Sequence, residues 1–189
     1  MSTPSSDGSS ARPERSRAFA AVAGPGTRVL ILGSLPGVAS LRAAEYYAHP
    51  QNGFWRLAGA MIGREIAALP YPERLAALAA AGVGVWDVIA SAERRGSGDA
   101  AIRAPAPADL ATLVAGLPAL RAVGFNGGTA ARIGRRQLGT ALGVALVDLP
   151  SSSPAYAAMP FDEKRRRWLR LSRYLGDVGS QGPDGNPHA

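Results

Sequence analysis

Residues 28–33 read RVLILG, and this stretch decides the fold. A short apolar run that ends at a glycine is typical of a strand buried on both faces of a sheet. Similar runs recur at 83–89 (VGVWDVI), 120–125 (LRAVGF) and 144–149 (VALVDL). Buried strands that alternate with helices form parallel sheets covered on both faces. The sequence therefore predicts an α/β fold, a three-layer α/β/α sandwich with a central four-stranded parallel sheet.

The segments between these runs have the apolar spacing of helices, and Pro72 suits the first turn of one of them. Helices are expected at 54–62, 72–81, 108–116, after 128 as far as 138, and 161–175, the last of them rich in arginine. Two longer connections, 34–51 and 91–104, are expected to be loops.

The chain is expected to hold one folded domain between two disordered tails. Its 189 residues are enough for a single core, and 47% of them are hydrophobic. Residues 1–26 and 177–189 are polar and have little to bury, which leaves 27–176 as the domain. No run of about 18 apolar residues occurs, and the N-terminus lacks the apolar stretch of a signal peptide. We therefore expect a cytoplasmic protein without a membrane partner.

Composition excludes several kinds of chemistry. The chain has no cysteine, which rules out disulfides, a cysteine-ligated iron–sulfur cluster and a thiol nucleophile. Its two histidines, His49 and His188, make no recognisable metal site, so neither a metal nor a cofactor is expected. The net charge of +7 suits a polyanionic partner such as DNA, although a bias of the whole proteome would explain it equally well.

Four polar segments that contain glycine or proline follow the carboxyl ends of the expected strands. They span 33–52, 87–97, 126–128 and 150–156. In open parallel sheets ligands bind beyond the carboxyl ends of the strands, so these segments should converge on one site.

These segments resemble the uracil-DNA glycosylase superfamily, and most closely its hypoxanthine (deoxyinosine) DNA glycosylase branch. The patterns GS-x-P-x-x-x-S, YYAHPQN-x-FW, GVG-x-WDV and PS-x-SPA occur in this order, within a region of about residues 28–175. We expect a monomer, since one flipped base needs one pocket. The resemblance implies a monofunctional DNA glycosylase. Such an enzyme flips a deaminated base, hypoxanthine or uracil, out of DNA and hydrolyses its N-glycosidic bond in base excision repair.

The segment around HPQN is expected to act on the base. By resemblance Asn52 is the essential residue, which orients water or binds the leaving base, although an Asn here also suits a helix cap. His49 is expected to donate to the base or a phosphate, with a packed loop residue as the alternative. By resemblance Phe54 is expected to stack on the base, with a place in the core as its alternative. Tyr47 and its neighbour Tyr46 are expected to form a wall of the pocket.

The ends of the strands supply the other expected pocket walls. These are Gly33, Ser34, Leu35, Asp87 and Asn126. By resemblance, Leu35 stands where other branches carry a water-activating Asp, and Asp87 where they carry a base-reading Asn. Ser151 likewise replaces a His that stabilises the departing base. These departures favour the hypoxanthine branch over robust excision of uracil.

The last loop and the terminal helix are expected to hold DNA outside the pocket. The residues concerned are Ser151, Ser152, Ser153, Pro154, Tyr156, Lys164 and Arg165. The serines should pin phosphates, Tyr156 should wedge into the vacated stack, and the basic helix should add salt-dependent attraction. The structural alternatives are a polar surface turn for the serines, core contacts for the residues that follow them, and a solvated face for the basic helix. Lys164 is the only lysine and lies away from the expected pocket, so no Schiff-base lyase step is expected.

Two other classes of function remain open at this point. A non-catalytic DNA- or nucleotide-binding module on the same fold would be consistent with the missing Asp and His. An enzyme that acts on free nucleosides would use GSLPG as a phosphate loop. The arginine-rich helix and the lack of a Walker-type or G-x-G-x-x-G motif speak against that enzyme.

Overall fold

A four-stranded parallel sheet forms the centre of the protein. The computed structural model describes residues 15–94, 97–139 and 143–176. The sheet has the order β3-β2-β6-β7, and all its neighbouring strands run parallel. The strands are β2 (Val29–Gly33), β3 (Val83–Asp87), β6 (Ala122–Asn126) and β7 (Ala145–Leu149). The predicted central sheet is therefore confirmed.

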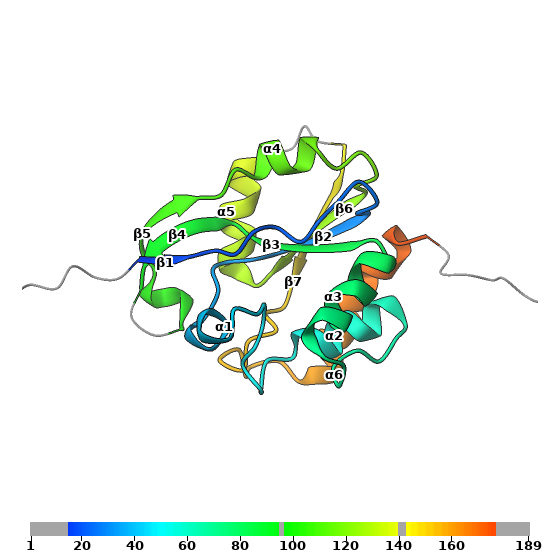
Figure 1. Cartoon of the computed structure of the whole chain (residues 1–189), viewed down its shortest axis with the longest axis horizontal. Helices are drawn as coiled ribbons and strands as arrows, with labels where there is room; N and C mark the ends of the chain where they lie inside the picture. The colour runs from blue at the N-terminus through cyan, green and yellow to red at the C-terminus, as the bar shows by residue number, and fades with distance from the viewer. Residues whose placement is uncertain (1–14, 95–96, 140–142, 177–189) are drawn as a thin grey trace, which may run out of the picture.

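Helices cover both faces of this sheet, which makes three layers (Figure 1). One face carries α4 (Leu110–Ala115) and α5 (Gly128–Leu138). The other carries α2 (Phe54–Ile62), α3 (Tyr71–Ala80), α6 (Phe161–Trp168) and the 3-10 helix η2 (Leu169–Tyr174). The expected terminal helix therefore changes from α to 3-10 geometry after Trp168.

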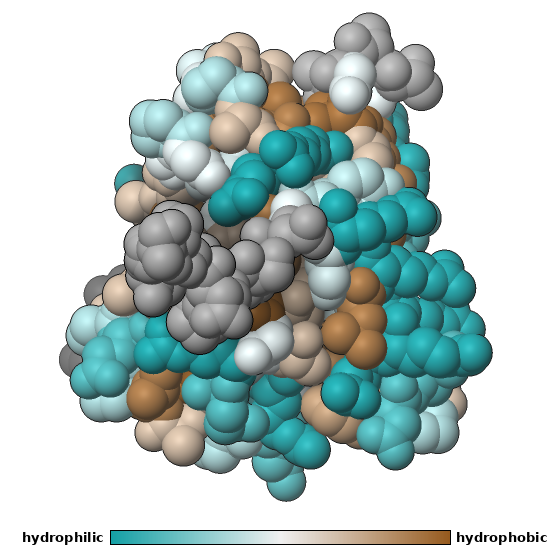
Figure 2. Space-filling model, turned by 90° about the vertical axis from the view of Figure 1, so that its right-hand side faces the viewer, coloured by the Kyte–Doolittle hydropathy of each residue, from teal (hydrophilic) through white to brown (hydrophobic). Residues whose placement is uncertain are grey.

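Two apolar clusters lie between the layers, one on each side of β2. Side chains of a strand point alternately to its two faces. Val29 and Ile31 pack with the side of α2 and α3, whereas Leu30 and Leu32 pack with the side of α4 and α5. All four are fully buried, as expected for a strand covered on both faces. On the side of the molecule shown in Figure 2, hydrophilic residues predominate and apolar residues form small, separate areas.

A second, antiparallel sheet stands where the sequence predicts only a polar loop at 91–104. Here β4 (Ile89–Glu93) lies between β1 (Arg15–Arg17) and β5 (Arg103–Pro107), and the 3-10 helix η1 (Asp99–Ala101) precedes β5. The loop prediction is wrong because these short, polar strands are paired partly through a distant segment, β1. The two prolines of β5 are tolerated because one side of an edge strand needs no hydrogen-bond partner.

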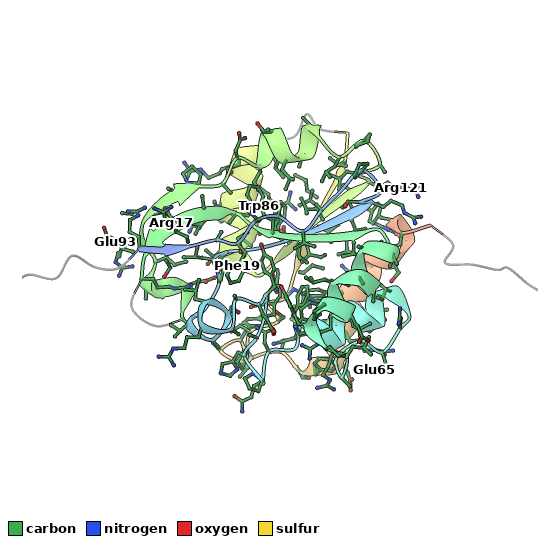
Figure 3. The ribbon with its side chains drawn as sticks, viewed as in Figure 1. Arg17, Phe19, Glu65, Trp86, Glu93 and Arg121 are labelled. Carbon is green, nitrogen blue, oxygen red and sulfur yellow. The ribbon has the colours of Figure 1, made fainter. Side chains whose placement is uncertain are left out.

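The N-terminal segment packs on the domain from residue 15 onward, so the tail prediction for 15–26 is wrong; residues 1–14 and 177–189 lie outside the described residues. Val22 bridges Val85 of β3, and the Trp86 indole donates to the Phe19 carbonyl at 2.9 Å (Figure 3). The segment contains a short apolar run at 18–23 (AFAAVA), of which Phe19 and Val22 pack on the core. They do so beside β3, an outer strand of the central sheet, which would otherwise present an open edge.

The connection that follows β2 contains one further helix, α1 (Val38–Ala43), within the predicted loop 34–51. The chain leaves it at Ala44, which has a positive φ of 54°. In the described part of the chain, no helix combines the length and the apolar character needed to cross a membrane.

Candidate active site

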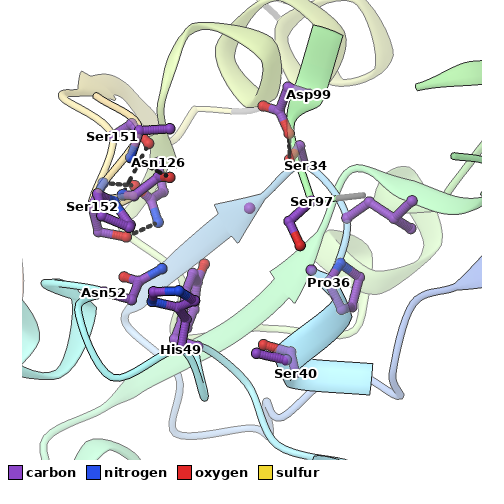
Figure 4. A pocket seen from close by; sticks show the side chains of 18 of the residues that line it. Ser34, Pro36, Ser40, His49, Asn52, Ser97, Asp99, Asn126, Ser151 and Ser152 are labelled. Carbon is purple, nitrogen blue, oxygen red and sulfur yellow. Dashed lines mark hydrogen bonds between the residues drawn. The ribbon is translucent and has the colours of Figure 1, made fainter. Parts of the chain in front are cut away.

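A cavity of about 470 Å³ opens at the carboxyl ends of β2, β3 and β6 (Figure 4). This volume lies in the range of about 300–1,000 Å³ that is usual for ligand pockets. The predicted site residues that line it are Gly33, Ser34, Leu35, Tyr47, His49, Asn52, Asp87, Asn126, Ser151, Ser152, Ser153, Pro154 and Tyr156. The segments expected to converge on one site are therefore brought together by the parallel sheet.

A buried carboxyl group, that of Asp87, forms the floor of the cavity. Asp87 ends β3 opposite Gly33 of β2, and a Cβ added to Gly33 would lie 2.6 Å from its Oδ1. Asp87 is 3% exposed, and its Oδ2 has no hydrogen-bond partner. Burial raises the pKa of Asp87 to about 7, against a smaller opposing effect of the Arg94 guanidinium. The group can therefore change its protonation near neutral pH, which carboxyls in water do not.

Tyr47 is an aromatic residue that lines the cavity, and Phe54 lies behind its ring. The two rings stack with centroids 3.7 Å apart, and Phe54 is fully buried and does not line the cavity. Phe54 begins α2 on its core side, where it also contacts Trp55 and Trp168 edge-on. The expectation that Phe54 faces the base is therefore wrong for this conformation, because the aromatic two residues before HPQN covers it.

The Tyr47 hydroxyl is buried without a hydrogen-bond partner, close to Asp87. Burial, followed by the Asp87 charge, raises the pKa of Tyr47 well above its usual range. The Asn126 amide has the opposite, smaller effect on that pKa, although no hydrogen bond of ordinary geometry joins the two side chains. Tyr47 also has a positive φ of 55°, which bulky residues rarely adopt. Backbone strain of this kind concentrates at functional sites.

Asn52 and His49 lie side by side at the cavity (Figure 4). The Asn52 Oδ1 accepts a hydrogen bond from the Phe54 N–H at 3.0 Å, so Asn52 does help to cap α2, from the position before the formal N-cap Gly53. Among the described residues nothing accepts from its Nδ2. The His49 Nδ1 accepts from the Gln51 N–H at 3.2 Å, so a neutral His49 ring carries its proton on Nε2. Both side chains thus keep a donor for a ligand.

The last loop is tied to the sheet through Ser152. The Asn126 Nδ2 donates to the Ser152 hydroxyl at 2.9 Å, and the Ser152 N–H donates to the Asn126 Oδ1 at 2.8 Å. The Ser152 carbonyl also accepts from the Gly53 N–H at 2.9 Å. Ser152 is 3% exposed, so the expected phosphate contact does not fit it. Ser151 and Ser153 are only partly buried and remain available to DNA.

The two residues of α6 that were expected to bind DNA differ in their positions. Lys164 is 8% exposed, and its Nζ donates to the Tyr156 carbonyl at 2.7 Å. Its predicted DNA contact is therefore wrong in this conformation, because the last loop covers the ammonium group. Arg165 is exposed and, with Arg56 and Arg64, borders a separate hollow between α2 and α6.

A group of residues after β4 was missed by the sequence reasoning. Arg94 donates to the carbonyls of Leu35 and Pro36, at 3.3 Å for Leu35. The Ser34 hydroxyl donates to Asp99 at 2.7 Å, and the Ser97 hydroxyl accepts from the Val38 N–H at 3.0 Å. The connection between β4 and β5 therefore holds the segment that follows β2. The signal was the cluster of charged and hydroxyl residues directly beyond the second expected strand.

The groups at the cavity suit hydrolysis without an internal nucleophile. Leu35 is 6% exposed and supplies no group to activate water, and Ser151 supplies no ring to stabilise a leaving base. The polar groups at the cavity include the Asn52 amide, the His49 ring, the Asp87 carboxyl and the Tyr47 hydroxyl, while the Asp99 carboxylate accepts from the Ser34 hydroxyl. Within the described ranges, no cluster of three or more His, Cys, Asp or Glu residues could hold a metal ion.

The chain is similar to a model of the uracil DNA glycosylase superfamily over residues 21–172. It is 40% identical over 113 residues to a protein of Methanosarcina barkeri (strain Fusaro) named hypoxanthine DNA glycosylase, across 60% of this chain and 72% of that protein. A Methanosarcina acetivorans protein of the same name is 39% identical over 139 residues, across 74% of this chain and 87% of that protein.

A solved structure shares the fold. It is the solution NMR structure of a Methanosarcina acetivorans protein, provisionally described as a uracil DNA glycosylase, with a TM-score of 0.76 and 35% sequence identity. The similarity covers 86% of this chain and 99% of that chain.

Proposed function

The chain belongs to the uracil DNA glycosylase superfamily, which makes it a DNA N-glycosylase, and we propose that the base it removes is hypoxanthine. Support comes from the two Methanosarcina proteins that carry this activity in their names. The proposed context is base excision repair of deaminated DNA, with uracil as a possible second base.

The observation that carries the proposal is the set of free polar atoms around the cavity. Hypoxanthine offers a ring N–H donor beside a carbonyl acceptor, whereas adenine offers a ring acceptor beside an amino donor. The unpartnered Oδ2 of Asp87 can accept from the ring N–H. The Tyr47 hydroxyl and the Asn52 Nδ2 can donate to the carbonyl. With Asp87 ionised, adenine in the same orientation would place its ring acceptor against the carboxylate and its amino donor against the Asn52 Nδ2, and such unmatched polar groups are how a pocket rejects a wrong ligand.

The chemistry follows from what the pocket supplies. Cleavage passes through an oxocarbenium-like sugar, as in other glycosyl hydrolyses. Water adds to C1′ of the sugar and gives up one proton, while the electron pair of the broken bond leaves with the base, which takes up one proton, so that the step balances. We assign Asn52 to hold the water or the departing base, and the Nε2–H of His49 to donate to the base or a flanking phosphate. The chain has no carboxylate at Leu35 to balance the positive charge that develops on the sugar. We assign this role to the flanking DNA phosphates.

Alkali-revealed strand cleavage tests this function. Labelled duplexes that each carry one inosine, uracil, xanthine or thymine mismatch are treated with the wild type, Asn52→Ala and Gln51→Ala. The matched control is Gln51, which is exposed and does not line the cavity. We expect cleavage at inosine by the wild type and by Gln51→Ala, and its loss in Asn52→Ala.

The other outcomes are equally informative. Cleavage at uracil but not at inosine would keep the enzyme class and overturn the proposed substrate. DNA binding without cleavage of any lesion would instead favour a non-catalytic binding module. Undiminished cleavage by Asn52→Ala would remove Asn52 from the proposed mechanism.

A further inference from the structure

We propose that Lys164 is a positioning residue, which fixes the last loop so that Tyr156 can enter the DNA stack when a base is flipped out. The proposal rests on the proposed function, because only an enzyme that extrudes a base needs such a wedge. It replaces the expectation that Lys164 contacts phosphate directly.

The ammonium group of Lys164 is bonded to the loop and buried beneath it. Its Nζ donates to the Tyr156 carbonyl at 2.7 Å and lies 5.0 Å from the centroid of the Tyr156 ring. Lys164 is 8% exposed and makes no ion pair with the other described residues. A buried charge is costly unless it is hydrogen-bonded, so the bond to this carbonyl compensates the buried ammonium group.

A second donor on the same face of α6 binds the start of the loop. Residues four positions apart lie on one face of a helix, and Trp168 follows Lys164 by four. The Trp168 indole donates to the Pro150 carbonyl at 3.0 Å. Trp168 is itself fully buried, with its ring edge-on to Phe54 at 5.8 Å. The loop is therefore attached to the core at its first residue and again at Tyr156.

Tyr156 has the exposure that a wedge needs. Tyr156 and Leu169 are the large hydrophobic side chains that stand out as exposed in the described ranges, at 39% and 36%. Tyr156 also lines the mouth of the cavity. Proteins that unstack DNA insert side chains of this kind between base steps. An exposed side chain can resist the returning base only if its backbone is held, and the Lys164 bond holds that backbone at the residue itself.

The other cations of α6 are placed differently, which gives a comparison within one helix. Arg166 and Arg167 both pair with Glu163, while Arg165 is exposed and unpaired among the described residues. Arg165 can reach a phosphate without rearrangement. Lys164 could do so only by releasing the Tyr156 carbonyl.

The test compares Lys164→Met with Arg165→Met in the full chain. Methionine keeps the length of the side chain and removes the donor. Binding to an inosine duplex is measured by fluorescence anisotropy at several salt concentrations. Base extrusion is measured by the fluorescence rise of 2-aminopurine placed beside the inosine, and cleavage is measured in a single turnover.

We expect Lys164→Met to bind DNA with the wild-type salt dependence, while extrusion and cleavage fall about tenfold because one charge-assisted hydrogen bond is lost. Lys164→Arg should recover part of the loss. Tyr156→Ala should lower extrusion to a similar extent, and adding Lys164→Met to it should cause no further loss, since both act through one loop. Arg165→Met should instead reduce the salt slope by about one.

The proposal is overturned by a reduced salt slope in Lys164→Met, and equally by losses of Lys164→Met and Tyr156→Ala that multiply. If the methionine variant does not fold, Lys164→Leu repeats the test, again without a donor. A wild type that cleaves no lesion contradicts the proposed function. A wild type that cleaves, beside a Lys164→Met that flips and cleaves equally well, contradicts only the role of Lys164.

Discussion

The ring of Tyr47 lies flat on the ring of Phe54, with the two planes 9° from parallel. Because Phe54 is fully buried behind this contact, a base that enters the cavity as it stands meets Tyr47. The stack joins the cavity wall directly to the cluster between the sheet and α2, so the wall is part of the rigid core. Substitutions of Tyr47 should therefore affect mainly cleavage, whereas substitutions of Phe54 should affect mainly stability.

Tyr47→Ala is expected to slow cleavage of inosine DNA, since base–aromatic stacking contributes about 1–3 kcal/mol per base. Phe54→Ala removes a buried ring and should lower the free energy of unfolding by about 3–5 kcal/mol. Single-turnover rates and urea unfolding of both variants measure these effects. A Phe54→Leu variant that folds normally but loses as much cleavage as Tyr47→Ala would mean that the base reaches Phe54.

Substitutions at Asn52 should separate its cap from its chemistry. Asn52→Ala loses the oxygen that binds the Phe54 N–H, at a cost of about 1 kcal/mol in the free energy of unfolding. Asn52→Asp keeps an acceptor there and removes the Nδ2 donor. The Asp variant should therefore unfold like the wild type but fail to cleave. Thermal unfolding and cleavage are compared, and an active Asp variant would show that the amide donor is not needed.

The buried carboxyl of Asp87 should make stability depend on pH. Its pKa is about 7 in the folded protein, against 3.8 for the unperturbed group. Between these values the folded state binds the proton that the unfolded state has lost, so the free energy of unfolding falls as pH rises. Above about pH 7 both states are ionised and this contribution is constant.

Asp87→Asn removes that titration while keeping the size of the side chain. Urea unfolding at pH 5 and pH 8 should show the free energy of unfolding of the variant rising relative to that of the wild type, by about 2.7 kcal/mol, which corresponds to the two pH units between pH 5 and pH 7. Equal pH profiles of the two proteins would mean that Asp87 is already ionised at pH 5.

Arg94→Met should change the titration of Asp87 from a distance. The guanidinium lowers the pKa of Asp87, so its removal should raise that pKa above about 7. The pKa can be followed through the NMR shift of the Asp87 carboxyl carbon. Arg103→Met is the control, because Arg103 is exposed and, among the described residues, its side chain donates to the nearby carbonyls of Ala100 and Ile102. A pKa that stays the same in Arg94→Met would show that the two groups do not interact.

The errors of the sequence-based prediction have a common physical origin. The apolar run at 18–23 (AFAAVA) is short and flanked by Arg, Ser, Gly and Pro, and its Phe19 and Val22 meet a sheet edge that only the folded domain provides. β4 and β5 were not predicted because they lack a long apolar run. Their backbone pairing with β1 and with each other forms the small sheet. Contacts between segments far apart in the chain leave no periodicity for a local pattern to reveal.

The sequence by itself determined the parallel sheet and the place of the site. Apolar runs such as 28–33 are buried on both faces wherever helices flank them, and the carboxyl ends of parallel strands then meet at one edge. Only the tertiary structure decided which side chains of the convergent loops face the cavity. Packing and hydrogen bonding decide this. Tyr47 covers Phe54, the Ser152 hydroxyl accepts from the Asn126 amide, and the last loop covers Lys164. Residue types and spacing are silent on such contacts, because each depends on the direction in which a neighbouring element presents its atoms.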